Sequence, residues 1–147
     1  MTITEVTTYP MELLLLADPE EQAIQAYITR SNCYVKELDG KVVGIYVILP
    51  TRPHTIEIMN IAVEENLQGK GIGQQLIQHA IQTSRELGYT CIEIGTGNSS
   101  FPQLYLYQKC GFRIVGIDKD YFVHHYEEAI FENGLQCRDM VRLRRYI

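Results

Sequence analysis

The fold of this chain is indicated first by the stretch Gln68-Gly69-Lys70-Gly71-Ile72-Gly73. This glycine-rich stretch follows a predicted strand, Ile56 to Val63, and opens a predicted helix that runs to about Leu87. A turn of this kind exposes backbone N–H groups at the positive end of a helix. It is therefore a ready anion site, and the most common anion at such a site is a phosphate.

Three kinds of phosphate ligand compete for this turn. A nucleoside triphosphatase requires Gly-Lys followed by Ser or Thr, whereas Gly69-Lys70 is followed by Gly71. A dinucleotide-binding fold requires Gly-x-Gly-x-x-Gly after a first parallel strand, whereas this chain has Gly69-x-Gly71-x-Gly73. The third candidate is coenzyme A, whose pyrophosphate would bind the N–H groups of residues 69–74. A plain turn between a strand and a helix, without a ligand, is the remaining alternative.

The segment before the turn begins with an edge strand and two helices. Residues 2–8 alternate apolar and polar side chains, and Pro10 to Ala17 is typical of a short buried helix. Asp18 is predicted as the N-cap of a second helix, with Pro19 at the first position and Glu21 completing a capping box.

Two strand-like runs follow, Cys33 to Leu38 and Lys41 to Leu49. They are joined by Asp39-Gly40, which is a strong signal for a β-hairpin. Pro50 and Pro53 are predicted to end the second arm. The glycine turn therefore comes after an antiparallel meander.

The segment after the turn predicts a helical crossover and another strand. Apolar residues recur at helical spacing, Gly88 is a predicted C-cap, and His79 is predicted to lie on the solvated side of the helix. Thr90 to Gly95 is the next strand, and it must run parallel to Ile56–Val63 because a helix connects the two. The remaining predicted elements are a helix at Pro102–Lys109 and strands at Phe112–Ile117 and Gln136–Arg144. The sequence thus predicts one α/β domain over residues 1–147, with a mixed central sheet.

Composition limits the class of protein. At 147 residues, with 46% hydrophobic residues, the chain can bury the core of one domain. A formal net charge of -5, from 13 basic and 18 acidic residues, disfavours nonspecific binding to nucleic acid. The longest apolar run, Leu13 to Ala17, is too short to span a bilayer, and the N-terminus lacks the basic flank of a signal peptide. We therefore expect no membrane partner. The four cysteines have neither metal-ligand nor disulfide spacing, so we expect reduced thiols, no metal ion and a cytoplasmic location.

Two segments together resemble one known family. The stretch from Gln68 to Gly73 matches the Gln/Arg-x-x-Gly-x-Gly/Ala signature of the GNAT-superfamily N-acetyltransferases, and Leu106-Tyr107-Gln108-Lys109-Cys110-Gly111-Phe112 is similar to the second acetyl-CoA segment of that family. The order of the predicted elements also resembles the family along the chain. The resemblance implies the GNAT fold, in which one strand of the parallel pair splays from its neighbour and acetyl-CoA lies in the gap. It further implies an acetyl-CoA-dependent N-acetyltransferase.

The resemblance implies a set of site residues. Those expected to contact acetyl-CoA are Ile61, Ala62, Val63, Gln68, Gly69, Lys70, Gly71, Ile72, Gly73, Gln74, Asn98 and Tyr107. The residue that matches Tyr107 is the usual general acid of the family, and the residue that matches Glu57 is a general base in some members. Each role has an alternative. Tyr107 could serve only as a packing aromatic, and Asn98 could serve only to hold its loop. Glu57 could face solvent, in which case a water chain would act as the base.

These roles agree with the chemistry of amine attack on a thioester. The attacking amine must be uncharged, although amines are mostly protonated at neutral pH, so a sheltered carboxylate can accept the proton. A strand N–H group can stabilise the negative charge that develops on the carbonyl oxygen. A tyrosine can supply a proton to the departing thiolate. Neither a metal ion nor a covalent enzyme intermediate is required.

The acceptor is expected to be a primary amine, either of a small molecule or of a lysine or N-terminus in a peptide. Residues 118–132 interleave five acidic residues with aromatic ones, which would suit a cation, and a solvated loop is the alternative. Other readings of the chain are a non-catalytic acyl-CoA-binding module and an enzyme for another acyl-CoA or an alcohol acceptor. The alternating C-terminal strand, with Arg142, Arg144 and Arg145, predicts a possible homodimer through an extended sheet.

Overall fold

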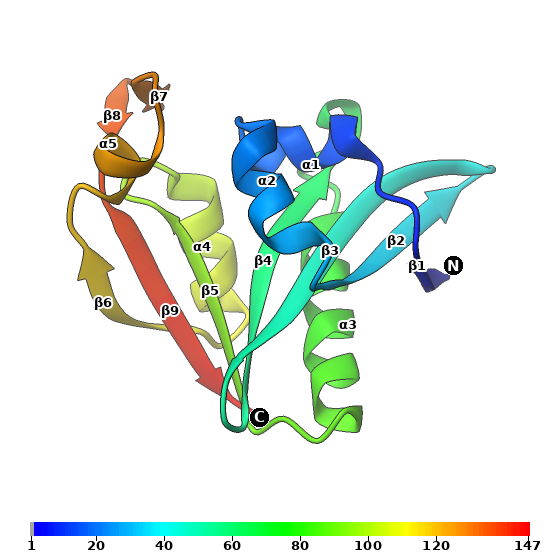
Figure 1. Cartoon of the computed structure of the whole chain (residues 1–147). Helices are drawn as coiled ribbons and strands as arrows, with labels where there is room; N and C mark the ends of the chain where they lie inside the picture. Colours follow the sequence, from blue (N-terminus) through cyan, green and yellow to red (C-terminus); the bar gives the residue numbers. More distant parts are fainter. Residues whose placement is uncertain (1) are drawn as a thin grey trace.

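The computed structural model describes residues 2–147 and centres on one mixed sheet (Figure 1). Within these residues the sheet has seven strands in the order β1-β2-β3-β4-β5-β9-β6. The strands of this sheet are β1 (Ile3–Val6), β2 (Asn32–Leu38), β3 (Lys41–Arg52), β4 (Thr55–Val63), β5 (Cys91–Gly97), β6 (Arg113–Asp118) and β9 (Met140–Tyr146), and a separate hairpin comprises β7 (Ile130–Glu132) and β8 (Leu135–Cys137). The helices are α1 (Met11–Ala17), α2 (Glu21–Ile28), α3 (Ile72–Glu86), α4 (Phe101–Lys109), α5 (Tyr121–His125) and a single 3₁₀ turn, η1 (Glu65–Leu67).

The parallel pair is the one that the sequence predicts. Strands β4 and β5 run parallel, whereas the other strand pairs of the described residues are antiparallel. Helix α3 forms the crossover between β4 and β5, because parallel neighbours cannot be joined by a tight turn. The predicted fold class, an α/β arrangement around a mixed sheet, is confirmed.

Helices cover opposite faces of the sheet (Figure 1). Helices α3 and α4 pack on one face, where Leu76, Ile56 and Ile92 belong to the larger apolar core. Helices α1 and α2 pack on the other face, where Leu14 and Ile24 belong to a second core. In Figure 1, α1 and α2 lie over β3 and β4, and most of the same face of β9 is left without a helix among the described residues. Part of the sheet surface is therefore open beside α1 and α2.

The predicted hairpin is confirmed, but its second arm is longer than predicted. Asp39 and Gly40 have φ values of 52° and 79°, as a two-residue hairpin turn requires. Strand β3 continues through Pro50 and ends at Arg52, directly before Pro53, so the prediction is wrong for Pro50 and confirmed for Pro53. The register shifts between Pro50 and Arg52, and such an irregularity accommodates a residue that cannot donate to the ladder.

The predicted cap of the second helix is also wrong. Helix α2 begins at Glu21 with Glu20 as its N-cap, and Asp18 instead ends α1, where its N–H group donates to the carbonyl of Leu14 at 3.1 Å. The Asp18 carboxylate accepts a hydrogen bond from the Tyr126 hydroxyl at 2.8 Å. The side chain of Asp18 therefore bonds to a residue distant in the sequence and does not cap α2.

The C-terminal strand differs from its prediction in two ways. The run from Gln136 to Arg144 is divided between β8 and β9, because the N–H groups of Arg138 and Asp139 donate to the side chain of Asn98 instead of to a ladder. Strand β9 lies between β5 and β6 in the sheet. It therefore has no free edge, and the predicted extension of the sheet through this strand is wrong.

His79 of α3 is partly buried rather than solvated, so that prediction is wrong as well. Its Nδ1 atom lies 2.7 Å from the hydroxyl oxygen of Tyr46, which also donates to the hydroxyl of Thr83 at 3.1 Å. The ring of Tyr34 stacks on Tyr46 with a centroid separation of 4.8 Å. Burial lowers the pKa of His79 below its ordinary value of 6.5.

The remaining predictions about composition concern cysteines, metals and membranes. Cys33, Cys91, Cys110 and Cys137 are all free thiols and all buried. In residues 2–147, three or more His, Cys, Asp or Glu side chains never gather as a metal site would require. Of the helices in that range, none is both long and apolar enough to cross a membrane.

The environment of His79 predicts a pH dependence of stability. The unfolded chain binds the proton more readily than the folded chain, so the free energy of unfolding should decrease as pH falls from about 7.5 through the lowered pKa of His79. Urea unfolding at a series of pH values should show a shallower loss for His79→Gln than for the wild type. His124→Gln, on the exposed side of α5, serves as the control and should retain the wild-type slope. Equal slopes for His79→Gln and the wild type would contradict the assignment.

Candidate active site

The central feature of the molecule is a cleft where β4 and β5 separate. Their ladder runs only from Thr55–Cys91 to Ile58–Ile94. In the pairing of β4 with β3, the register passes from Ile48–Ile58 to Val47–Asn60, so Met59 is an extra residue of a bulge. A bulge bends its strand and increases the local twist, which accounts for the divergence from β5 directly after Ile58.

The cleft is large enough for an extended small molecule, with a volume of about 560 Å³. Residues 59–63 of β4 line one wall, and residues 95–97 of β5 line the other. Because the β4–β5 ladder has ended, backbone N–H and C=O groups on these facing edges are available to a ligand that contains amide groups. The three residues predicted to offer backbone groups, Ile61, Ala62 and Val63, all lie in this wall.

The glycine turn closes one end of the cleft. Gly69 and Gly71 have φ values of 76° and 88°, a region that favours glycine, and Gly71 is the N-cap of α3. No side chain caps the helix, so the N–H groups of its first turn remain available to a ligand, at the positive end of 15 residues of helix. The side-chain amide of Gln68 donates to the carbonyl of Val63 at 3.0 Å and holds the turn against β4.

The predicted residues of the turn divide into two groups. Gln68, Gly69, Gly71, Gly73 and Gln74 line the cleft. Ile72 points into the core beneath the turn and Lys70 is exposed, and neither lines the cleft. The site on this side is consequently formed mainly by backbone groups, which suits an anion such as a pyrophosphate.

Tyr107 of α4 stands in the wall of the cleft. Only 4% of the residue is exposed, and its ring packs on Phe112 with a centroid separation of 6.4 Å. Among residues 2–147 its hydroxyl forms no hydrogen bond, and burial raises its pKa above the ordinary value of 10.0. A neutral phenol in a cleft wall is available to donate a proton to a ligand.

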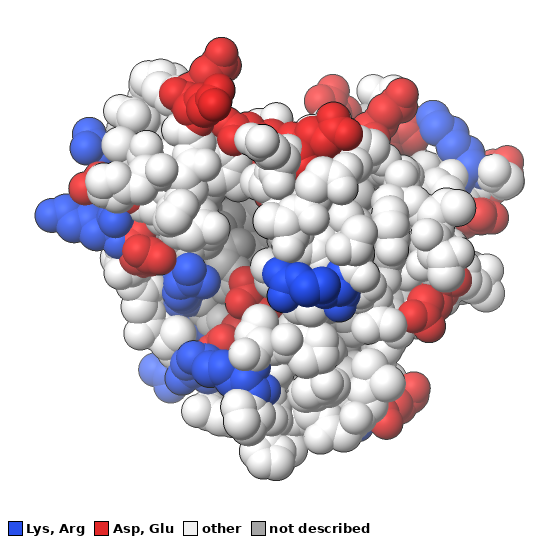
Figure 2. Space-filling view, viewed as in Figure 1, with Lys and Arg blue, Asp and Glu red and all other residues white. Residues whose placement is uncertain are grey.

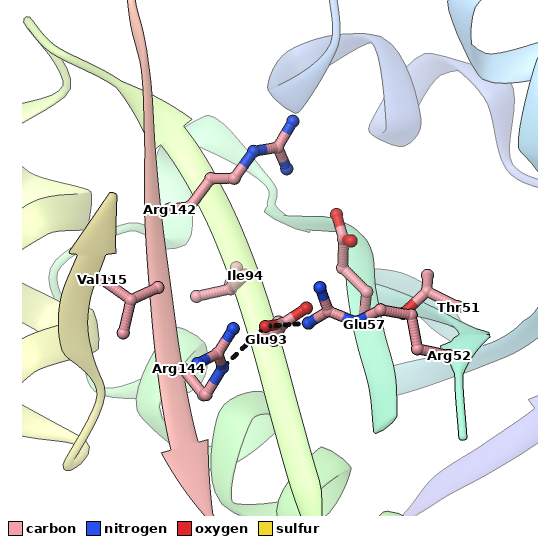
Figure 3. Close-up of a pocket in the computed structure, with 8 residues that line it drawn as sticks. All are labelled: Thr51, Arg52, Glu57, Glu93, Ile94, Val115, Arg142 and Arg144. Atoms are coloured by element: carbon pink, nitrogen blue, oxygen red, sulfur yellow. Dashed lines mark hydrogen bonds and ion pairs between the residues drawn. The ribbon is translucent and has the colours of Figure 1, made fainter. Parts of the chain in front are cut away.

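Glu57 lies in a second, smaller cavity of about 200 Å³. This cavity shares Ile94 with the cleft and is lined by charged side chains of four strands, so we call it the arginine pocket (Arg52, Glu57, Glu93, Arg142 and Arg144; Figure 3). Burial raises the pKa of Glu57, and this effect is opposed mainly by the charge of Arg142. The carboxylate forms no hydrogen bond or ion pair with another residue of the described chain, so it is available to a substrate.

Asn98 serves the protein backbone. Its Oδ1 atom accepts from the N–H groups of Arg138 at 2.7 Å and Asp139 at 2.9 Å, and its Nδ2 atom donates to the carbonyl of Gln136 at 3.2 Å. It does not line the cleft. The structure thus gives Asn98 a role in holding β8 and β9 beside β5, and contact with acetyl-CoA stays a prediction for this residue.

Sequence reasoning missed the roof of the cleft. The bond between Tyr126 and Asp18 joins residues 108 positions apart, and the N–H group of Glu127 donates to the carboxylate of Glu20 at 3.0 Å. Together they link the α1–α2 connection to the segment after α5, and Asp18 and Tyr126 both line the cleft. No local pattern predicts such a contact, because its partners come from distant elements.

Two of the acidic residues in the segment 118–132 are paired with arginines, so the charge of this segment is partly neutralised. Asp118 pairs with Arg142 and Asp120 pairs with Arg138, each at 3.3 Å. In Figure 2 the middle of this face is hollowed, with Lys and Arg side chains on both sides of the hollow and Asp and Glu side chains along the upper rim. The surface around the site therefore combines both signs of charge.

Comparisons with known proteins agree with this geometry. The model of the Acetyltransferase (GNAT) family matches residues 4–112. A curated relative, the uncharacterized N-acetyltransferase YvbK of Bacillus subtilis (strain 168), is 58% identical over 132 residues, which are 90% of this chain and 85% of that protein. Several curated relatives at 26% to 33% identity are longer, and this chain spans about half of their length.

Solved structures are similar over nearly the whole chain. The IAA acetyltransferase from Bacillus cereus ATCC 14579 has a TM-score of 0.98 at 55% identity and 99% coverage of both chains. A GNAT family acetyltransferase from Elizabethkingia anophelis, solved with acetyl-CoA bound, has a TM-score of 0.97 at 44% identity, covering 99% of this chain and 97% of that one. This chain is therefore a member of the GNAT acetyltransferase family, an enzyme that takes its acetyl group from acetyl-CoA.

Proposed function

We propose that this enzyme transfers the acetyl group directly to the nitrogen of a primary amine. The observation that carries the proposal is the cleft itself, which has a backbone-lined anion site at one end, Tyr107 in its wall and Glu57 in the cavity beside it. A cofactor held by backbone groups leaves the side chains of the opposite end for the acceptor. The acceptor is an amine of a small molecule or of a peptide.

Acetyl-CoA is bound in the proposal by two sets of backbone groups. Its pyrophosphate accepts hydrogen bonds from the N–H groups of the turn around Gly69 and Gly71 and of the first turn of α3. Its pantetheine amides pair with the edge of β4 at Ile61 to Val63. These contacts place the thioester where β4 and β5 separate, between Tyr107 and the arginine pocket.

The chemical step then needs two proton transfers. The amine nitrogen attacks the thioester carbon and forms the N–C bond, and Glu57 accepts the proton that the amine loses, directly or through one water molecule. The C–S bond breaks, and the thiolate of coenzyme A takes a proton from the Tyr107 hydroxyl. The raised pKa of Glu57 favours its role, because this carboxylate has a higher affinity for a proton than an exposed one. Burial keeps Tyr107 protonated, so its hydroxyl has a proton to donate.

The role of Tyr107 is tested by removing one oxygen atom. Tyr107→Phe should lower kcat by about 100-fold, because proton transfer by a positioned side chain contributes about 10² to 10⁴ in rate. The dissociation constant for acetyl-CoA, measured by titration calorimetry, should change by less than about twofold, because the backbone anion site is intact. Tyr9→Phe, in the loop between β1 and α1, is the matched control. Wild-type kcat in Tyr107→Phe would rule out the general acid.

The role of Glu57 is tested through the pH profile. In the wild type, kcat/KM should decrease as pH falls through the raised pKa of Glu57, because the protonated carboxyl cannot accept the amine proton. In Glu57→Gln, the decrease in kcat/KM that is due to Glu57 should disappear, and kcat should be about 100-fold lower. The pH dependence that arises from protonation of the acceptor amine should remain. Glu37→Gln, on the exposed part of β2, should behave as the wild type. An unchanged acidic limb in Glu57→Gln would assign the base to another group.

A further inference from the structure

The arginine pocket is built by the register of four strands. Glu57 of β4 lies opposite Glu93 of β5, which lies opposite Arg144 of β9, so these side chains form one row across the sheet. Arg142 lies opposite Gly95, two residues closer to the cleft, and Arg52 enters from the end of β3. Figure 3 shows Arg52 and Arg144 meeting at Glu93, while Arg142 and the Glu57 carboxylate extend beside this group.

Positive charge exceeds negative charge in this pocket. The Oε2 atom of Glu93 accepts from Arg52 at 2.5 Å and from Arg144 at 2.8 Å, so one carboxylate oxygen serves two guanidinium groups. Each guanidinium carries five N–H donors, and this contact uses one donor of each. The side chains of Glu93 and Arg144 are 16% and 29% exposed, whereas that of Arg52 is 55% exposed, so water screens the Arg52 pair more than the Arg144 pair. The three groups together carry one uncompensated positive charge beside unpaired N–H donors.

Arg142 is available to a ligand for a different reason. Its ion pair with Asp118 has a length of 3.3 Å, and the two side chains are 42% and 49% exposed, so the pair contributes little energy. The guanidinium also lies 5.8 Å from the centre of the Tyr121 ring, which holds it over the pocket. In Figure 3 it and the Glu57 carboxylate point into the same space from opposite sides. A ligand in that space meets an unpaired anion on one side and a weakly paired cation on the other.

We propose that the arginine pocket binds a carboxylate of the acceptor, so that the acceptor is an amino carboxylate with its amine at Glu57 and its carboxylate at Arg142 and the Arg52–Arg144 pair. This inference rests on the proposed function, because it takes Glu57 to receive the amine proton. A planar guanidinium matches the two oxygens of a carboxylate. A volume of about 200 Å³ suits a small molecule, and one uncompensated charge matches a single carboxylate.

The same pocket disfavours polyamines. A second ammonium group on the acceptor would meet three guanidinium groups, and repulsion of this kind is an effective means of discrimination. The acidic residues Asp118 and Asp120, which in the sequence suggest a site for cations, are paired with Arg142 and Arg138. The arginine pocket therefore predicts a preference for an anionic acceptor, whereas Asp118 and Asp120 by themselves would predict a cationic one. Glu57 lines the arginine pocket, so the preference of the pocket should decide.

The test compares acceptors that differ only in the charge at one end. Thiol release from acetyl-CoA is measured with ω-amino acids of two to six carbons, with their amides and with diamines of equal length. At the best chain length, kcat/KM should be at least about 10-fold higher for the carboxylate than for the amide, and lowest for the diamine. Arg142→Gln should remove most of the advantage of the carboxylate over the amide, and Arg142→Lys should retain part of it.

Arg138→Gln is the matched control, because Arg138 forms an ion pair of the same length with Asp120 outside the pocket. It should retain the preference for the carboxylate. Equal kcat/KM values for carboxylates and amides at all lengths, in an enzyme that acetylates these amines, would overturn the inference and leave the proposed function in place. Absence of turnover with all of these acceptors, while acetyl-CoA still binds, would overturn the inference. If lysine-bearing peptides were not acetylated either, the proposed function would be overturned with it.

Discussion

The structure depends on the separation of β4 from β5 after the Ile58–Ile94 pair. Before that pair the strands are joined by a parallel ladder, and after it their facing edges are open to a ligand. The bulge at Met59 allows β4 to bend while its other edge stays bonded to β3. Strand β4 thus stays bonded to β3 on one edge while its other edge faces the ligand, which gives the cleft a rigid wall. Rigid elements hold a reacting group more precisely than a loop does.

The two ends of the cleft use different physics. At the glycine turn, Gly69 and Gly71 present N–H groups of the backbone, whose partial charges suit the phosphates common to every molecule of coenzyme A. At the other end, charged side chains from β4, β5 and β9 lie in rows fixed by strand register. Backbone groups do not depend on the identity of side chains, whereas the arginine pocket does. In our proposal, the second end therefore sets acceptor preference, while the cofactor end stays the same.

Local patterns predicted much of the fold because they depend on neighbours in the chain. The Asp39-Gly40 hairpin follows from turn geometry, and the parallel pairing of β4 with β5 follows from a helical crossover. The errors arose where a distant partner outweighs a local preference. Asp18 resembles an N-cap but bonds to Tyr126, His79 lies on a polar helix face but contacts Tyr46, and β9 resembles an edge strand but is enclosed by β5 and β6.

The site divides in the same way. The sequence by itself determined the glycine turn, the helix that follows it and the presence of Tyr107 in a second motif, because these features consist of contiguous residues whose spacing carries the information. Only the tertiary structure decided that Asn98 holds β8 and β9, that Glu57 lies beside Arg142, and that Arg52 and Arg144 share Glu93. These residues come from strands far apart in the chain, and strand order and register, which bring them together, are set by long-range packing.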